Sequence, residues 1–241
     1  MAGDLTGLGA LVSGGASGIG RSCAAVLAER GARVAILDRV TAPSGMAGVI
    51  ADIRRPDQVR AAVTQAEAAI GRIDILVNNA GISGRSLPLD AIDDNAFDDM
   101  FATHVKGAFV CAQAVAPGMK ARRFGRIVNI SSHFALIGSA SASHYVGAKA
   151  ALHGFTKAWA LEFAPFGITV NAVAPGLVDT PMTRASVGDA ELARRGAGYP
   201  VGRLPTMDEI AFAVAWLAGR ETDTITGQII SPNGGIAMAG G

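Results

Sequence analysis

Hydrophobic and polar positions along the chain follow two alternating patterns, short apolar runs rich in β-branched residues and longer stretches with helical periodicity. Alternation of this kind is typical of β-α-β units, in which helices cover both faces of a parallel sheet. The sequence therefore predicts an α/β fold, a single doubly wound Rossmann-type domain over residues 1–241. Helices are expected to begin near residues 18, 56, 97, 143 and 206, and strands to occupy 10–13, 33–37, 49–51, 73–78, 126–130, 168–172 and 228–231.

Two segments break the alternation. Residues 39–48 join two predicted strands but contain Pro43, Gly45 and Gly48, so this link is too short and too broken for a crossover helix. Residues 181–205 are polar and contain glycine, and their length suits a lid over a site. We expect this lid to select the substrate. Its four arginines either meet an anionic substrate or, as is commoner, are solvated charges.

Composition narrows the class of protein. Half of the residues are hydrophobic but only 5% are aromatic, so the core is expected to be aliphatic. The formal net charge is +1, from 21 basic and 20 acidic residues, which does not suggest a nucleic-acid partner. The arginines within 122–126 are read as a solvated turn. Cys23 and Cys111 are expected to be buried thiols in a reducing compartment, and no apolar segment is long enough to span a membrane. We expect a cytoplasmic protein.

The first predicted strand leads into a glycine-rich turn that opens the first helix. Glycines in such a turn let the backbone approach a pyrophosphate, which the amides and dipole of the helix N-terminus attract. The spacing G-x-x-x-G-x-G differs from the commoner G-x-G-x-x-G, but its place between first strand and first helix favours a dinucleotide site. The predicted contacts are Ser13, Gly14, Ser17, Gly18, Ile19 and Gly20.

A carboxylate ends the second predicted strand, 18 residues after Gly20. Asp38 at this place is expected to accept hydrogen bonds from the adenosine ribose hydroxyls and to repel a 2′-phosphate. Arg39 opposes this preference, because its guanidinium suits that phosphate. The cofactor is therefore predicted to be NAD, with NADP the less favoured alternative.

These features and others farther along the chain resemble the short-chain dehydrogenase/reductase family. The resemblance covers essentially the whole sequence, and it implies an oxidoreductase with about seven parallel strands in one doubly wound sheet. It is carried by Ser13-Gly14-x-x-x-Gly18-Ile19-Gly20, Asn78-Asn79-Ala80-Gly81, Ser132 with Tyr145-x-x-x-Lys149, Pro175-Gly176 and Gly234-Gly235.

The resemblance assigns the chemistry to three side chains. Tyr145 and Lys149 are four residues apart, so on a helix they share a face, and the ammonium is expected to lower the tyrosine pKa from about 10. Tyr145 is implied as the general acid/base, Lys149 also holds the nicotinamide ribose, and Ser132 binds the substrate oxygen. The resemblance also implies cofactor contacts, and it implies no metal. Besides Tyr145 and Lys149, they are Asp52 and Ile53 at the adenine, Asn79, Ala80 and Gly81 along the cofactor, and Pro175, Gly176, Val178 and Thr180 at the nicotinamide.

One position departs from the family pattern. Where many members have an asparagine that holds a proton-relay water, this chain has His104. Because imidazole titrates near neutral pH, one hypothesis is that His104 preserves the relay in altered form. The alternative is that it only packs. His133 and Phe134, beside the catalytic serine, either narrow the pocket or face away from it.

The predicted function is hydride transfer between NAD(H) and a secondary alcohol or its ketone, a small molecule. Two alternatives stay open, an NADPH-dependent 3-oxoacyl-thioester reductase, which Asp38 disfavours, and a non-catalytic dinucleotide sensor. The resemblance also implies a homo-oligomer, a tetramer or a dimer. Its expected contacts are the apolar faces of two long helices, 97–119 and 144–164.

Overall fold

Seven parallel strands form one sheet in the computed structural model, which describes residues 4–83 and 86–238. Their order is β3-β2-β1-β4-β5-β6-β7, and every neighbouring pair is parallel, so the predicted doubly wound domain is confirmed. The strands are β1 (Gly9–Ser13), β2 (Arg33–Asp38), β3 (Ala47–Ile50), β4 (Ile75–Asn78), β5 (Gly125–Ile130), β6 (Ile168–Val173) and β7 (Ile229–Ile230).

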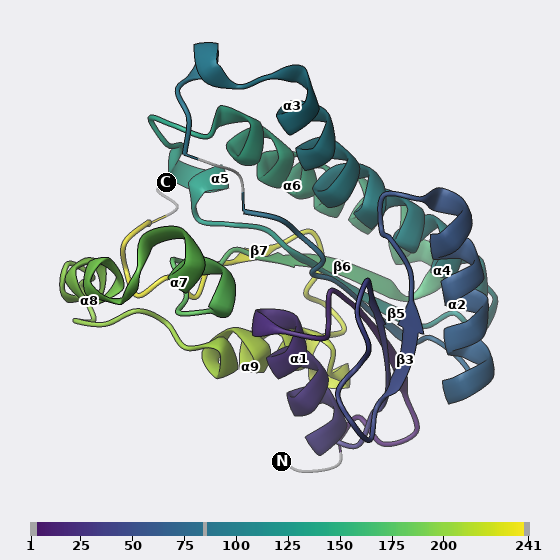
Figure 1. Cartoon of the computed structure of the whole chain (residues 1–241). Helices are drawn as coiled ribbons and strands as arrows, with labels where there is room; N and C mark the ends of the chain where they lie inside the picture. The colour runs from purple at the N-terminus through teal and green to yellow at the C-terminus, as the bar shows by residue number, and fades with distance from the viewer. Residues whose placement is uncertain (1–3, 84–85, 239–241) are drawn as a thin grey trace.

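Two layers of helices cover the sheet, one on each face (Figure 1). Helices α1 (Gly18–Glu29) and α9 (Met207–Leu217) pack against one face, and the other carries α2 (Pro56–Ile70), α4 (Gly107–Arg122) and α6 (Ser143–Phe163). Among the described residues, no helix is both long enough and apolar enough to cross a membrane.

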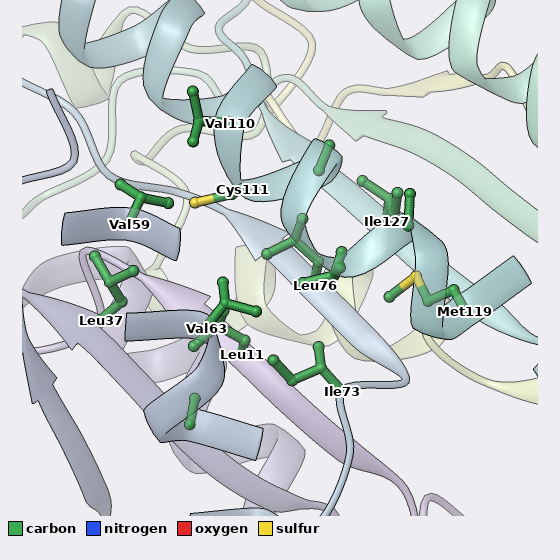
Figure 2. Packing of buried hydrophobic residues seen from close by; sticks show 14 of the residues in the cluster. Leu11, Leu37, Val59, Val63, Ile73, Leu76, Val110, Cys111, Met119 and Ile127 are labelled. Carbon is green, nitrogen blue, oxygen red and sulfur yellow. The ribbon is translucent and has the colours of Figure 1, made fainter. Parts of the chain in front are cut away.

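The core is divided by the sheet into two clusters, because successive residues of a strand point to opposite faces. Leu11 of β1 packs with α2 and α4, whereas its neighbour Val12 packs with α1 and α9. Figure 2 shows part of the first cluster, with Val63 of α2 among the side chains gathered around Leu11. Burial raises the pKa of Cys111 in this cluster to about 12, and the thiol of Cys23 in the other has the same value.

The helical stretch predicted to begin near residue 97 starts three residues earlier and is interrupted. Helix α3 (Asp94–Phe101) begins after Asp93, whose carboxylate accepts the amide of Ala96 at 2.7 Å. A π-helical turn (Ala102–Lys106) then leads into α4. Such turns often mark functional positions, and this one carries His104.

The two irregular segments, the link after β2 and the lid, differ in secondary structure. The link after β2 contains no helix, as predicted. The lid contains two helices that were not predicted, α7 (Pro181–Val187) and α8 (Asp189–Ala197), which lie beyond the end of the sheet in Figure 1. The remaining short helices are α5 (Phe134–Ile137) and the 3₁₀ turns Leu89–Ala91, Ala164–Phe166 and Arg220–Thr222.

Candidate active site

The predicted site residues meet along one edge of the sheet. In a parallel sheet the carboxyl ends of the strands share an edge, and ligands bind where the strand order reverses, here between β1 and β4. Each of the first six strands is followed at this edge by a predicted residue or ends in one: Ser13, Asp38, Asp52, Asn79, Ser132 and Pro175.

The glycine-rich turn is packed tightly against the loop after β4. Gly14 has φ +66°, and a Cβ there would lie 2.7 Å from the Cα of Ala80. A Cβ on Gly20 would lie 2.2 Å from the carbonyl oxygen of Gly14. Asn79 donates its side-chain amide to Ser13 O and Gly14 O, and Ser13 Oγ accepts the amides of Asn79 and Ala80. The side chains of Ser13 and Asn79 therefore hold the glycine-rich turn against the loop after β4.

The start of α1 fits a diphosphate. The first amides of a helix have no partner within it, and the N-cap residue Ser17 makes no side-chain hydrogen bond to them. Gly18 has φ +54°, and a Cβ there would meet only Thr180, at 3.9 Å. The glycine-rich turn thus faces the segment after β6 across an open space, with the first amides of α1 on one side. Ser17, Gly18, Ile19 and Gly20 are the residues that would hold the phosphates.

Asp38 reaches over the glycine-rich turn from the end of β2. Its Oδ2 accepts the amide of Ala16 at 3.0 Å, and its Oδ1 accepts the amide of Arg39 at 2.7 Å. The side chain of Arg39 is exposed, and the described part of the chain provides no ion pair between it and Asp38. These two hydrogen bonds hold the carboxylate of Asp38 beside the position expected for the adenosine ribose.

The predicted adenine contacts lie after β3 and are held by other groups. Arg54 binds both carboxylate oxygens of Asp52, with its Nη2 2.8 Å from Oδ2, and lowers the pKa of that carboxyl. Ile53 is buried, and a Cβ on Gly107 would lie 2.5 Å from its Cγ1. Contact of Asp52 and Ile53 with adenine stays a prediction.

The proposed catalytic side chains converge because α6 begins just before Tyr145 and runs past the loop after β5. Tyr145 is half-buried and Lys149 is fully buried one turn later. The Nζ of Lys149 donates to the carbonyl oxygen of Ile130 at 2.7 Å and lies 5.8 Å from the centre of the Tyr145 ring. Ser132 hydrogen bonds with the Tyr145 hydroxyl, and its Oγ also accepts the amide of Phe134 at 3.2 Å.

The protonation of this pair differs from the prediction. Burial raises the pKa of Tyr145 above its ordinary value near 10, and the hydrogen bond with Ser132 only opposes this rise. The prediction that Lys149 lowers the pKa of Tyr145 is wrong for this structure, where the Nζ of Lys149 is turned toward Ile130 O. Burial also lowers the pKa of Lys149 to about 7. At neutral pH the phenol therefore keeps its proton, the form that donates to a carbonyl oxygen.

His104 is buried in the π-helical turn. Its Nε2 faces the backbone of Ile82, 3.1 Å from the amide nitrogen and 2.9 Å from the carbonyl oxygen. Its ring meets that of Tyr145 edge-on at 5.7 Å, and Gly81 makes room for it, because a Cβ there would lie 2.4 Å from Cε1. Burial, followed by the charge of Lys149, lowers the His104 pKa well below 6.5. The premise that this imidazole titrates near neutral pH is therefore wrong.

The segment after β6 is tied to the lid and to the serine loop. Thr180 caps α7, where its Oγ1 accepts the amide of Thr183 at 3.2 Å, and Thr183 Oγ1 donates to Val178 O at 2.7 Å. The carbonyl oxygen of Pro175 accepts the backbone amide of His133 at 2.9 Å and lies 3.1 Å from its Nδ1. The side chain of His133 is thus directed at the backbone of Pro175.

The lid arginines are neutralised within the protein. Each of the four binds at least one carboxylate, so none is free to meet an anionic substrate in this arrangement. The pairs are Arg184 with Asp179 and Asp189, Arg194 and Arg195 with Glu191, and Arg203 with Glu209.

Two features of the site were not predicted from the sequence. Tyr199, in the lid, accepts the amide of Leu177 at 2.8 Å through its hydroxyl. Behind Lys149, Ser131 Oγ donates to the carbonyl oxygen of that lysine at 3.0 Å and lies 2.8 Å from His153 Nε2. Tyr199 lies outside any periodic pattern, so only its contacts show that it belongs to the site. His153 lies one helical turn after Lys149, and this spacing could have indicated that it lies near the site.

Comparison with known proteins agrees with this geometry. A family model described as enoyl-(acyl carrier protein) reductase matches residues 14–237. The 3-oxoacyl-[acyl-carrier-protein] reductase of Vibrio cholerae is 39% identical over 98% of this chain and 99% of that protein, and the Escherichia coli enzyme of the same name is 39% identical over 95% and 97%.

Solved structures show the same fold. Ligand-free aldohexose dehydrogenase of Thermoplasma acidophilum superposes with a TM-score of 0.92 at 32% identity, covering 98% of this chain and 96% of that one. A protein of the short-chain dehydrogenase/reductase family gives a TM-score of 0.87 at 38% identity, with 96% and 98% covered. The chain belongs to the short-chain dehydrogenase/reductase family. It is therefore an oxidoreductase, and its cofactor is a nicotinamide dinucleotide.

Proposed function

We propose that this protein transfers a hydride between NAD(H) and a secondary alcohol or its ketone. The observation that carries the proposal is the convergence of Ser132, Tyr145 and Lys149 at the sheet edge that also carries the glycine-rich turn. When bound, the dinucleotide supplies or accepts the hydride. The non-catalytic sensor is disfavoured because all three side chains are present and in place.

The chain's own residues bind the substrate oxygen and move its proton. In the reductive direction Tyr145, protonated at neutral pH, donates its hydroxyl proton to the ketone oxygen, and in oxidation the same oxygen takes the proton back. Ser132 donates a hydrogen bond that steadies charge developing on the substrate oxygen. Lys149 is buried one helical turn from Tyr145 and is held by Ile130, a place from which it would bind the nicotinamide ribose.

Two observations bear on the substrate and cofactor. The curated relatives are named 3-oxoacyl-[acyl-carrier-protein] reductases, which favours a 3-oxoacyl thioester over secondary alcohols in general. This second candidate is the same reaction on a β-oxo ketone. The Asp38 carboxylate above the glycine-rich turn supports NAD(H), since it would repel a 2′-phosphate. We therefore propose NAD(H) as cofactor and a 3-oxoacyl thioester as the first substrate to assay, in the reductive direction.

The test compares the unmodified protein with Tyr145→Phe. Removing one hydroxyl is expected to lower kcat at least about 100-fold while the Kd for NADH stays within about twofold. Fluorescence titration with NADH and NADPH measures the affinities, and acetoacetyl-coenzyme A is assayed beside an aldohexose and simple secondary alcohols. Equal turnover in the variant would refute the mechanism. Tighter binding of NADPH would refute the role given to Asp38.

His104 is proposed to take part in a proton relay as a neutral imidazole. Its position between Ile82 and the Tyr145 ring, beside the charge of Lys149, supports this role. Within the described chain, Nδ1 is buried without a hydrogen-bond partner, so a water molecule bound there would complete its bonding. Because burial keeps the ring neutral, the relay would work by exchanging protons between ring nitrogens, without a stable imidazolium.

Self-association through α4 and α6 is proposed as well. Phe109 is 42% exposed on α4 and lies against Phe155 and Trp159 of α6, with ring centres 5.9 and 6.4 Å away. Phe155 and Trp159 are themselves stacked at 4.8 Å. Phe155 is half-buried and Trp159 is buried, so Phe109 is the exposed member of this aromatic cluster, and an exposed aromatic side chain of this kind is typical of subunit contacts. A second copy of the chain would cover this aromatic surface.

A further inference from the structure

We propose that Tyr199 is a positioning residue for the nicotinamide end of the cofactor site, an inference that rests on the function proposed above. Tyr199 follows α8 in the lid and is only 7% exposed. Its hydroxyl oxygen accepts the amide of Leu177, 2.8 Å away, in the segment between β6 and α7. That amide lies between Gly176 and Val178, two residues predicted to border the nicotinamide.

The fit around the phenol is close on both sides. A Cβ on Gly176 would lie 3.2 Å from the Tyr199 hydroxyl oxygen and 3.1 Å from the Cα of Asn233. Gly234 has φ +62°, and a Cβ there would lie 2.8 Å from Cδ1 of the Tyr199 ring. Both glycines therefore make room for this ring. The phenol fills the space between the segment after β6 and the turn after β7.

Backbone hydrogen bonds join the same three segments around the ring. The amide of Val201 donates to Gly234 O at 3.3 Å, and the amide of Gly176 donates to Pro232 O at 3.3 Å. The side-chain bond from Leu177 to Tyr199 is the shortest of the three. A lid residue thus holds the backbone at 177, and this bond ties the lid to the cofactor segment in addition to the bond from Thr183 to Val178 O.

The hydroxyl is the part of Tyr199 that the inference concerns, so Tyr199→Phe is the informative variant. The phenyl ring keeps the packing against Gly176 and Gly234, while the partly buried amide of Leu177 loses its acceptor. We expect the Kd for NADH to rise about three- to tenfold. The Kd for ADP-ribose, which lacks the nicotinamide, is expected to stay within about twofold, because Asp38 and the glycine-rich turn are untouched.

The experiment is an isothermal titration of both ligands into the unmodified protein, Tyr199→Phe and a control, Ser186→Ala. Ser186 is an exposed lid hydroxyl that donates to Met182 O and lies 3.3 Å from Ser83 Oγ, and neither contact involves Leu177. Amide hydrogen exchange at Leu177 is measured in parallel and is expected to accelerate only in Tyr199→Phe. An unchanged NADH affinity, or equal weakening of NADH and ADP-ribose, would overturn the inference. Failure of the unmodified protein to bind NADH would instead overturn the proposed function on which it rests.

Discussion

Burial sets the protonation of three titratable side chains at the proposed site, those of Tyr145, His104 and Lys149. Tyr145 keeps its proton, His104 stays neutral, and burial lowers the pKa of Lys149 to about 7. All three directions follow from the same cause, because removal of water disfavours whichever form is charged. Burial therefore keeps Tyr145 protonated at neutral pH, and a positive charge on Lys149 destabilises the folded protein.

The position of His104 makes a relay testable. The variant His104→Asn keeps a donor and an acceptor for the backbone of Ile82, but an amide cannot exchange protons between two atoms as imidazole does. We expect the pH–rate profile of kcat to shift by about half a pH unit or more. His104→Leu, which makes neither bond to Ile82, serves as the control for loss of local structure. An identical profile in His104→Asn would show that His104 only packs.

Lys149 is expected to reduce stability in a pH-dependent way. Its folded pKa of about 7 lies below the unfolded value of 10.5, so the unfolded chain binds more protons between these values and stability rises with pH there. The destabilisation is fully present below pH 7. Lys149→Met removes it, so the variant is expected to be inactive but more stable than the unmodified protein at pH 6. The difference is expected to shrink by about 2.7 kcal/mol between pH 6 and pH 9.

Urea unfolding of both proteins at the two pH values measures this difference, and the contributions of all other groups cancel in the comparison. A difference that does not change with pH would contradict the depressed pKa of Lys149.

At the scale of elements, helix boundaries decide which side chains meet. A regular α-helix continuing from Asp94 to Arg122 would carry His104 on a different face, because the π-helical turn changes the rotation between successive residues. Helix α6 begins at Ser143, so Tyr145 and Lys149 occupy its first two turns and face the loop after β5. The catalytic arrangement therefore depends on where these helices begin and turn.

Helix α9 offers a test of one such boundary. Its N-cap residue Thr206 accepts the amide of Glu209 at 3.2 Å, and the Glu209 carboxylate accepts the amide of Thr206 at 2.8 Å. We expect Thr206→Ala to lower the free energy of unfolding by about 1 kcal/mol, with kcat unchanged, because α9 packs on the face opposite α6. Thr64→Ala, at an exposed position inside α2, is the matched control and is expected to be nearly neutral. Equal effects would contradict the capping role.

At the scale of the molecule, the sheet places the site and the proposed subunit contact on different surfaces. The site lies along the carboxyl ends of the strands, whereas the exposed Phe109 lies on α4, packed against Phe155 and Trp159 of α6. Assembly through these helices would leave the lid and the mouth of the site uncovered. Such an assembly would also bury Phe109, which lies in the first turn of α4.

The assembly is tested by introducing a charge into this surface. Phe109→Glu is expected to convert the protein to a smaller species in light scattering coupled to size-exclusion chromatography, because a buried unpaired carboxylate opposes association. Val40→Glu, at a side chain 59% exposed in the link after β2, is the control and should leave the mass unchanged. A monomeric unmodified protein, or a variant of unchanged mass, would refute the proposed interface.

The amino-acid sequence by itself determined the order of the chemical motifs along the chain, the doubly wound fold and the family. Strands and helices have local periods, and the glycine-rich turn and Asp38 depend on residue type and short spacing, whereas the family resemblance implied Ser132, Tyr145 and Lys149. These features were predictable because every one is encoded within a few neighbouring positions.

Only the tertiary structure decided the rest. The raised pKa of Tyr145, the neutral His104 and the bond from Leu177 to Tyr199 depend on burial and on partners far apart in the chain. Lysine was expected to act on tyrosine from spacing alone, yet a backbone carbonyl supplied by β5 holds its ammonium instead. Solvent exclusion and long-range contacts have no local signature, which is the physical reason that sequence patterns did not reveal them.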